Sequence, residues 1–356
     1  EVRTNGIMEF KPTFQPGCLW IMVGKRAMDL RSRSRSPAAN RKIAVLGDRE
    51  FVLGSEKLGL LRDSSDLAHA SAFADLRSRL NEDGYLFVRG LLPKEIVVTA
   101  RHLVLKYLHD QGMLASDKPI EEGWVGVPQE SDQGRLKGAE DLCSSPGVLA
   151  CVEHQALQSF FDGLFERRSV TYDYKWLRTV RRGKSSGFHM DTVYMGNCKA
   201  PSLLTCWIPM MEISAQMGGI AVCRGSSSEP GFAKVRDTYG RLDLDTGDVG
   251  GTGWFSEDPE EVSRFGGHWQ TAEFQVGDVV VFPMHTMHGS TVNQTDRWRI
   301  SFDVRWQPED EVLDPRWVRD ANGTIPGTRS RWALHRDDRK EYPKTMEMAK
   351  KHWGLA

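Results

Sequence analysis

The chain has 356 residues, of which 40% are hydrophobic and 27% charged, and its formal net charge at pH 7 is −1. This length accommodates one large domain with insertions or two domains, and the near-neutral charge gives no general attraction to nucleic acid. No apolar run is long enough to span a membrane. The six cysteines include no CxxC pair, which is typical of reduced thiols. We therefore expect a cytoplasmic globular protein with neither a membrane nor nucleic acid as its partner.

Residues 1–65 differ in composition from the rest of the chain. Within them, the stretch GKRAMDLRSRSRSPAANRK holds seven basic residues against one acidic residue and has a Ser-Arg alternation. Such a segment is typical of a flexible basic leader, because it cannot bury enough apolar surface to fold. The alternative is a basic tail that binds RNA or a protein partner, or that is phosphorylated.

Residues 66–167 are predicted to be mainly helical. One helix with apolar residues at helical spacing is expected to end at Gly84. A second is expected over 93–112 and a third over 146–165, each with one apolar stripe. Between the first two, the stretch 85–92 reads as a strand. We interpret these helices as structural, since such stripes form core more often than cofactor sites.

Residues 168–308 change to short strands separated by Gly-, Ser- and Asp-rich turns. Helices followed by many short strands predict an α+β fold, with helices packed against an antiparallel β-barrel or sandwich. Residues 228–272 form a long Gly- and Asp-rich insertion, which we interpret as a lid or binding loop rather than a surface excursion. The expected domain is 66–312, followed by a charged helical extension over 313–356. The predicted strands are SVTYDYKWLRTV, SLLTCWIPM, GIAVC, AEFQ, VVVF and RWRISFDVRW.

The stretch SSGFHMDTVYMG places an imidazole and a carboxylate two positions apart, at His189 and Asp191. On a strand these side chains point to the same face, so both could ligate one ion. Such a pair alone is weak evidence, because it occurs by chance on many surfaces. The later stretch VVVFPMHTMHG offers a third ligand, His288 or His285. Two histidines and one carboxylate leave metal positions open, as in the facial triad of non-haem Fe(II) oxygenases.

The stretch RWRISFDVRW alternates arginine and other polar residues with aromatic and aliphatic ones. This pattern makes sense if the polar face lines a barrel interior that binds an anion while helices cover the apolar face. Arginine is the preferred partner of a carboxylate, through a bidentate fork. An arginine next to a metal triad suggests a dicarboxylate co-substrate held between the metal and the guanidinium. The polar face consists of Arg297, Arg299, Ser301, Asp303 and Arg305.

The stretches FHMD, CWIPM, MHGSTVNQTDRWRIS and GYLFVRGLLP together resemble the phytanoyl-CoA dioxygenase family of Fe(II)- and 2-oxoglutarate-dependent oxygenases. The resemblance covers roughly residues 66–308 and implies a double-stranded β-helix (jelly-roll) core with helices on its outside. It implies Fe(II) and 2-oxoglutarate as cofactors, O₂ as a reactant and ascorbate as a further reductant. The expected reaction is hydroxylation, or another oxidation, of a small molecule with release of succinate and CO₂.

The resemblance also implies roles for individual residues. His189, Asp191 and His288 would be the iron ligands and catalytic residues, and Arg299 would pair with the distal carboxylate of 2-oxoglutarate. Met190 departs from the family pattern, which usually has glutamine between the first two ligands. The residues expected to line the co-substrate with Arg299 are Ser290, Ser301 and Trp207.

The substrate is only loosely indicated by the sequence. It is expected over the iron, beneath the 228–272 insertion and the segment 117–131. Other function classes stay open: a non-catalytic metal-binding jelly-roll protein, a zinc hydrolase, or an RNA-associated protein acting through the Arg/Ser-rich leader. The oligomeric state is not indicated. The candidate substrate residues are Trp124, Trp254, Trp269 and Arg182.

Overall fold

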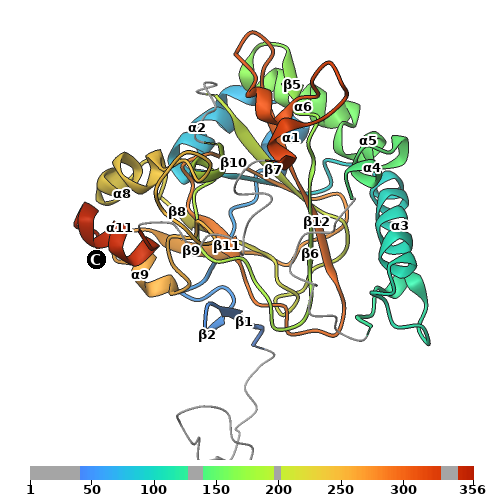
Figure 1. Ribbon diagram of the computed structural model, residues 1–356, viewed down its shortest axis with the longest axis horizontal. Helices are drawn as coiled ribbons and strands as arrows, with labels where there is room; N and C mark the ends of the chain where they lie inside the picture. The colour runs from blue at the N-terminus through green and yellow to red at the C-terminus, as the bar shows by residue number, and fades with distance from the viewer. Residues whose placement is uncertain (1–40, 127–138, 196–201, 330–343) are drawn as a thin grey trace, which may run out of the picture. The chain divides into compact units, whose positions relative to one another are not determined.

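A computed structural model of the chain describes residues 41–126, 139–195, 202–329 and 344–356 (Figure 1). These residues belong to one compact unit that begins at Arg41. The basic stretch predicted as a leader lies mostly in residues 1–40, outside the described residues. No helix in the described part of the chain is both long and apolar enough to cross a membrane.

Two sheets form the centre of this unit (Figure 1). The larger sheet has the strand order β4-β10-β7-β12-β5, and β6 pairs with residues 299–303 of β12. Its strands are β4 (Leu86–Val88), β5 (Ser169–Thr171), β6 (Trp176–Val180), β7 (Leu204–Pro209), β10 (Val279–Pro283) and β12 (Arg299–Pro308). The smaller sheet has the order β11-β8-β9-β3. Its strands are β3 (Gly59–Leu60), β8 (Ile220–Arg224), β9 (His268–Thr271) and β11 (His288–Ser290).

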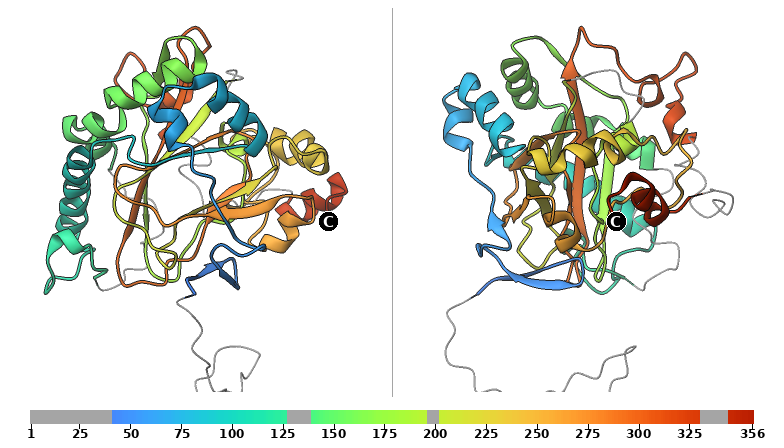
Figure 2. Two further views of the ribbon diagram at one scale, coloured as in Figure 1. Left: turned by 180° about the vertical axis from the view of Figure 1, so that it is seen from behind. Right: turned by 90° about the vertical axis from the view of Figure 1, so that its left-hand side faces the viewer.

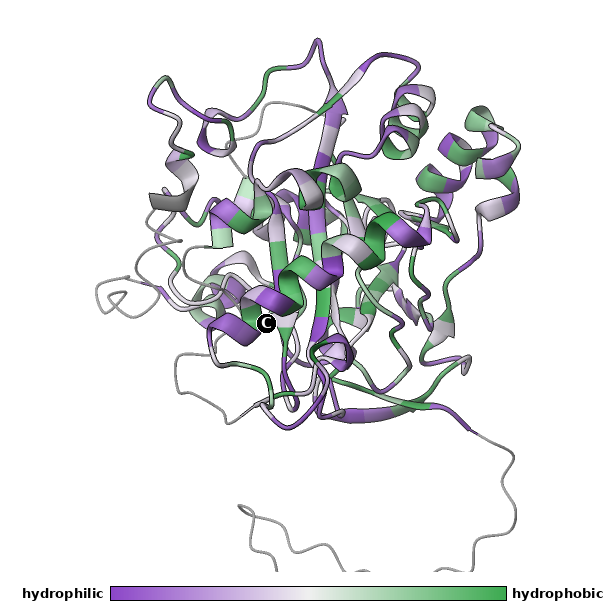
Figure 3. Cartoon of the chain, turned by 90° about the vertical axis from the view of Figure 1, so that its right-hand side faces the viewer, coloured by the Kyte–Doolittle hydropathy of each residue, from purple (hydrophilic) through white to green (hydrophobic). Residues whose placement is uncertain are grey.

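Strand pairing is antiparallel in both sheets apart from the pair β3–β9. Helices flank the sheets on the outside, and apolar and polar bands follow each other along the central strands (Figures 1 and 3). The predicted α+β class with a jelly-roll core is therefore confirmed. The predicted strand AEFQ is wrong as a regular strand, since Phe274 makes only an isolated bridge with Ile213.

Strand β12 shows why this sequence forms a central strand. Its apolar side chains and the neighbouring Trp298 are at most 1% exposed, and Trp306 stacks on Phe161 of a covering helix with ring centroids 4.9 Å apart. On the opposite face, Arg299, Ser301 and Arg305 are also buried. Charged side chains are rarely buried without a partner, so this face points to a polar interior with a specific task.

The helices of the first half lie around the larger sheet (Figures 1 and 2). The single helix predicted over 146–165 is wrong, because the chain turns at Glu153 and His154 and starts a new helix there. His154 accepts a hydrogen bond at Nδ1 from the Ala156 amide at 3.1 Å, which caps the second helix. The helices are α1 (Ser65–His69), α2 (Phe73–Asp83), α3 (Lys94–Asp110), η1 (Ile120–Glu122), α4 (Ala139–Cys143), α5 (Pro146–Val152) and α6 (Gln155–Phe165).

The 228–272 insertion is largely folded and is not an irregular loop. Its buried aromatic residues Phe232, Tyr239 and Phe255 pack into one cluster with residues of the C-terminal helix, and this apolar burial stabilises its short elements. Its helices lie beside the smaller sheet, and its strand β9 belongs to that sheet (Figures 1 and 2). The helices are η2 (Pro230–Phe232), α8 (Ala233–Asp237), η3 (Tyr239–Arg241) and α9 (Pro259–Ser263).

The predicted domain start at residue 66 is too late. Residues 43–52 form an antiparallel hairpin of β1 (Ile43–Leu46) and β2 (Arg49–Val52), and β3 joins the smaller sheet. Ala44 and Leu46 are fully buried, so the apolar residues after the basic stretch fold with the domain. The C-terminal extension contains η4 (Pro315–Trp317), η5 (Pro326–Arg329) and α11 (Met346–Trp353), and its residues 330–343 lie outside the described residues.

Candidate active site

The backbone brings the two candidate histidine ligands together. His189 and His288 form an isolated antiparallel bridge, in which each amide donates to the other's carbonyl oxygen at 2.9 Å. Their rings lie side by side with centroids 4.3 Å apart. Asp191 follows two residues later, immediately before α7 (Thr192–Met195). The prediction that the first pair lies on a regular strand is therefore wrong, although the intervening Met190 is fully buried in an apolar cluster.

The ligand atoms of these three side chains face one another. Oδ1 of Asp191 lies 3.8 Å from Nε2 of His189 and 3.8 Å from Nε2 of His288. All three ligand atoms lie within 4.8 Å of one another, and all three residues are buried. One ion with bonds of about 2.0–2.2 Å could contact the three atoms after small side-chain movements. The donor set of two imidazoles and one carboxylate fits a non-haem iron site.

Hydrogen bonds at the other ring nitrogens orient both imidazoles. The Nδ1 group of His189 donates to the Gly187 carbonyl at 2.8 Å, and that of His288 donates to the Thr286 carbonyl at 2.9 Å. Carbonyl oxygens only accept, so each Nε2 keeps its lone pair for a metal. Burial, aided by the neighbouring His288, lowers the pKa of His189 to about 3, which keeps this ring neutral at pH 7.

The two oxygens of Asp191 have different surroundings. Oδ2 accepts a hydrogen bond from Oγ1 of Thr205 at 2.6 Å and forms an ion pair with Nη2 of Arg305 at 3.0 Å. Burial alone would raise the pKa of Asp191, but Arg305 and the two imidazoles outweigh it and hold this pKa below its usual range. The carboxylate is therefore ionised, with Oδ1 left to face the histidines.

Sequence reasoning missed the part played by Arg305, which it placed on the polar face of RWRISFDVRW without a contact to a metal ligand. In the structure Arg305 and Thr205 are directly opposite each other on β12 and β7, so both reach the same oxygen. The inward alternation of β12 did indicate that the side chain points inward. Its partner could not be identified because the register between the two strands is not visible in the sequence.

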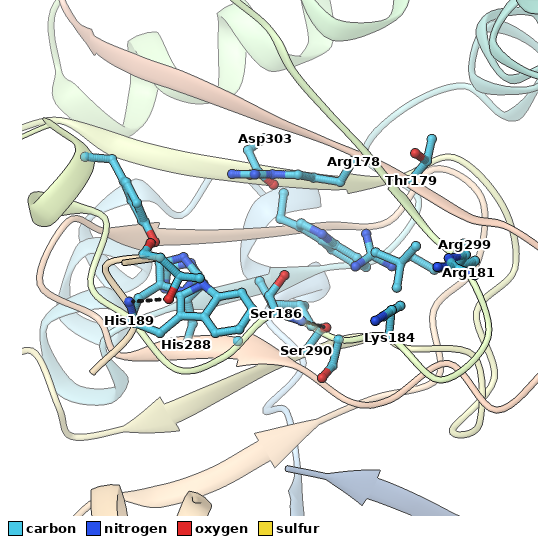
Figure 4. A pocket seen from close by; sticks show the side chains of 18 residues that line it. Arg178, Thr179, Arg181, Lys184, Ser186, His189, His288, Ser290, Arg299 and Asp303 are labelled. Atoms are coloured by element: carbon cyan, nitrogen blue, oxygen red, sulfur yellow. Dashed lines mark hydrogen bonds and ion pairs between the residues drawn. The ribbon is translucent and has the colours of Figure 1, made fainter. Parts of the chain in front are cut away.

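A cavity of about 280 Å³ opens beside the triad, and Figure 4 shows the side chains that line it. It lies between the two sheets, since its walls include Trp207 of β7, Ile220 of β8 and Arg299 of β12. Ser290, two residues after His288, also lines it. In Figure 4 the two histidines lie at one end of the cavity and Arg299 lies toward the other.

Arg299 is buried and incompletely partnered. Its Nη1 donates to Oγ of Ser301 at 2.6 Å, while its Nε has no hydrogen-bond partner among the described residues. Burial lowers the pKa of Arg299 to about 10, so the guanidinium remains charged at pH 7. A buried cation with an unused donor fits an anionic ligand that completes its hydrogen bonds. Ser301 contacts the guanidinium but is not among the residues that line the cavity.

The structure separates the candidate substrate residues. Trp254, from the insertion, lines the cavity. Trp269 is buried elsewhere, where its ring lies tilted against Phe188 and its Nε1 donates to the Pro259 carbonyl. The other two candidates also lie outside the cavity, which corrects the prediction. Trp124 packs under Arg297, and Arg182 is an exposed partner of Asp296.

The competing histidine, His285, lies outside the cluster of ligand atoms. A Cβ atom placed on Gly240 of η3 would lie 3.2 Å from its ring, so it packs against the insertion. Burial lowers the pKa of His285, and the nearby Arg236 and Arg241 lower it further. Of the two histidines, only His288 joins the cluster.

Comparisons with known proteins agree with this geometry. The family model "Phytanoyl-CoA dioxygenase (PhyH)" matches residues 80–301, which is more than half of the chain. The chain belongs to the phytanoyl-CoA dioxygenase family. Together with the buried His-Asp-His triad, this membership makes it an iron- and 2-oxoglutarate-dependent oxygenase. The predictions of family, enzyme class, iron and 2-oxoglutarate are thereby confirmed, while ascorbate stays a prediction.

Two curated relatives of this phytanoyl-CoA dioxygenase family member are named 1-deoxypentalenic acid 11-beta-hydroxylase. The protein from Streptomyces exfoliatus is 26% identical over 258 residues, which cover 68% of this chain and 86% of the relative. The protein from Streptomyces arenae is 24% identical over 256 residues, with the same coverage. Among solved structures, EctD from S. alaskensis with 2-oxoglutarate and 5-hydroxyectoine is 15% identical, with a TM-score of 0.49, covering 82% of this chain and 91% of that one.

Proposed function

We propose that this enzyme hydroxylates a small-molecule substrate at an iron centre held by His189, Asp191 and His288. The observation that carries the proposal is that the three ligand atoms converge beside the same cavity that Arg299 lines. Iron and 2-oxoglutarate supply the oxidising chemistry, in which O₂ oxidises 2-oxoglutarate to succinate and CO₂ while the substrate is hydroxylated. The names of the curated relatives support hydroxylation as the outcome.

The side chains prepare this centre before the reaction begins. The two Nδ1 hydrogen bonds fix the ring orientations, and Arg305 with Thr205 fixes the carboxylate, so that little reorganisation is needed when a metal binds. Burial of the triad limits the access of bulk water. The residues therefore contribute coordination geometry and a dry environment.

Arg299 is proposed to hold the distal carboxylate of 2-oxoglutarate. Its unpartnered Nε and its position toward the end of the cavity away from the histidines support this role. Ser290 and Trp207 line the same cavity and would contact the co-substrate, while Ser301 orients the guanidinium. A dicarboxylate would thus lie between the guanidinium and the metal.

Trp254 and the insertion would cover the substrate. The ring of Trp254 rests on Gly187, two residues before the first ligand, where an added Cβ would approach it to 2.5 Å. O₂ is proposed as the second reactant. We also propose a reducing compartment such as the cytoplasm, which the four free, buried cysteines of the described residues support.

Calorimetry tests the proposal by titrating 2-oxoglutarate under anaerobic conditions into protein with and without Fe(II). Binding is expected to require the metal, and the ternary complex should show the weak metal-to-ligand charge-transfer absorption of chelated 2-oxoglutarate. Admission of air should then release succinate. Equal affinity for 2-oxoglutarate in the presence and absence of metal would refute the proposed site.

A further inference from the structure

The cavity carries more positive charge than the described side chains or a dicarboxylate would neutralise. Its charged lining residues are Arg178, Arg181, Lys184, Arg299 and Asp303. Arg178 is paired with Asp303 at 2.9 Å. Arg299 is assigned to the distal carboxylate of 2-oxoglutarate, and the second carboxylate of that co-substrate would face the metal. Arg181 and Lys184 are then left without an anion.

Neither of these two side chains has a counter-ion among the described residues. Nε of Arg181 is buried and makes no hydrogen bond among the described residues, whereas Lys184 is an exposed residue that lines the cavity. Both residues nevertheless line the cavity, and Figure 4 shows them toward its end away from His189 and His288. Solvated surface cations need no partner, but a buried guanidinium nitrogen does.

The turn that carries these cations is held in place by Asn293. The Gly183 amide donates to the Asn293 carbonyl at 2.7 Å, and the Asn293 amide donates to the Lys184 carbonyl at 3.0 Å. The side-chain Nδ2 of Asn293 also donates to the Val180 carbonyl at 2.8 Å. Gly183 permits the turn through its φ of +73°. The two cations are therefore carried on a hydrogen-bonded turn, which reduces the entropy cost of binding.

Arg182 lies in the same turn and can be compared with Arg181 and Lys184. Arg182 points outward and is paired with Asp296 at 2.7 Å, with more than half of its side chain exposed. Arg181 and Lys184 on either side of it line the cavity and are unpaired. The sequence alone led to Arg182 as the candidate substrate residue of this turn. The structure instead pairs Arg182 with Asp296 and places Arg181 and Lys184 in the lining of the cavity.

We propose that Arg181 and Lys184 bind an anionic group, a carboxylate or a phosphate, of the primary substrate. This inference rests on the proposed function, because it assigns Arg299 to 2-oxoglutarate. The apolar lining from Trp254 and Ile220 would contact the rest of the molecule. The expected substrate is therefore an amphiphilic acid: an apolar body that carries one anionic group.

The test measures binding to protein loaded with Ni(II) and 2-oxoglutarate, because Ni(II) replaces iron without supporting turnover. A panel of cycloaliphatic, aromatic and alkyl carboxylates is titrated against the matching carboxamides, and phosphate monoesters against the matching alcohols. At least one acid is expected to bind roughly tenfold or more tightly than its neutral partner, which is about 1.4 kcal/mol. The carboxylate and phosphate arms identify the kind of anion.

Three variants test which side chains of the turn bind the anionic group. Arg181→Met and Lys184→Met should each weaken binding of that acid roughly tenfold, while the affinity for 2-oxoglutarate stays within about twofold of wild type. Arg182→Met removes a charge from the same turn and should bind the acid as wild type does. If no acid in either arm binds better than its neutral partner, the proposal is wrong.

The variants also separate this proposal from the proposed function. Loss of 2-oxoglutarate affinity in Arg181→Met or Lys184→Met would place these cations in the co-substrate site and overturn the substrate assignment alone. Failure of the wild-type protein to bind 2-oxoglutarate with Ni(II) would instead overturn the proposed function. If Arg182→Met weakened acid binding equally, the loss of affinity would come from the general surface charge of the turn. That result would also contradict the proposal.

Discussion

Arg305 holds Asp191 through the carboxylate oxygen that faces away from the histidines, with 3.0 Å between Nη2 and Oδ2. The guanidinium is fully buried, lies over the ring of Trp176, and leaves Oδ1 free on the metal side. Because partners of metal ligands fix ligand orientation, such contacts affect metal affinity nearly as strongly as the ligands do. Arg305 is therefore expected to position a metal ligand without touching the metal.

Arg305→Met should weaken metal binding by roughly 10–100-fold, the usual cost of losing a partner of a metal ligand. The cause is that Asp191 would lose its ion pair and become free to rotate. Equilibrium dialysis with Ni(II) measures this without activity, and Arg299→Met serves as a matched control because its guanidinium does not contact Asp191. Arg305→Lys should restore part of the affinity. Unchanged Ni(II) affinity in Arg305→Met would show that Thr205 alone positions the carboxylate.

The choice between the two histidines of MHTMH gives a second prediction. His288→Ala removes a ligand atom 3.8 Å from Asp191 Oδ1 and should abolish both stoichiometric metal binding and turnover. His285→Ala removes a ring packed against the insertion and should retain metal binding with a measurable fraction of turnover. Metal analysis of the two purified variants decides the matter. Loss of metal from His285→Ala, with His288→Ala still loaded, would reverse the assignment.

The co-substrate anchor gives a third prediction. Arg299→Lys keeps the charge but loses the planar fork, so the distal carboxylate would lose one hydrogen bond and the buried site would be left imperfectly paired. A loss of about 2 kcal/mol corresponds to a roughly 30-fold weaker affinity for 2-oxoglutarate. Titration of the metal-loaded variant measures it. Arg297→Lys is the matched control, because Arg297 is half-exposed and paired with Glu122. Equal affinity of the two variants would place the anchor elsewhere.

Much of this site could be predicted because it depends on local patterns. The alternation through β12 correctly separated the face buried under helices from the face that carries Arg299 and Ser301. The Gly-Ser that follows His288 resembles the family pattern, and this resemblance favoured His288 over His285 as the ligand. The spacing of His189 and Asp191 indicated two side chains that the structure does bring together, but for a wrong reason, since a turn into α7 and not a strand places them there.

What could not be predicted depends on contacts between distant segments. The pairing of Arg305 with Asp191 requires the register of β7 against β12, and the outward turn of Arg182 requires Asp296, more than a hundred residues away. Large aromatic residues were the weakest candidates. Trp124, Trp254 and Trp269 have the same chemistry, and only tertiary packing decides which of them meets the cavity.

The contact of the insertion with the ligand loop gives the last prediction. A Cβ added at Gly187 would come within 2.5–2.9 Å of three atoms of the Trp254 indole, and such overlap forces either the ring or the backbone to move. Gly187→Ala should therefore lower stability by about 1–3 kcal/mol, the usual cost of overpacking. It should also weaken 2-oxoglutarate turnover, because the carbonyl of Gly187 accepts the hydrogen bond that orients His189.

A double-mutant cycle isolates the cause. Trp254→Ala removes the ring that meets the new methyl group, so the pair Gly187→Ala with Trp254→Ala should be no less stable than Trp254→Ala alone, a coupling of about 1–3 kcal/mol. Urea denaturation of the four proteins measures the coupling, and Ni(II) dialysis shows whether the metal site survives in each. If the two substitutions were instead additive, the ring would not rest on Gly187. The insertion would then be independent of the segment that carries the first metal ligand, and its role as a cover for the substrate would lose its structural basis.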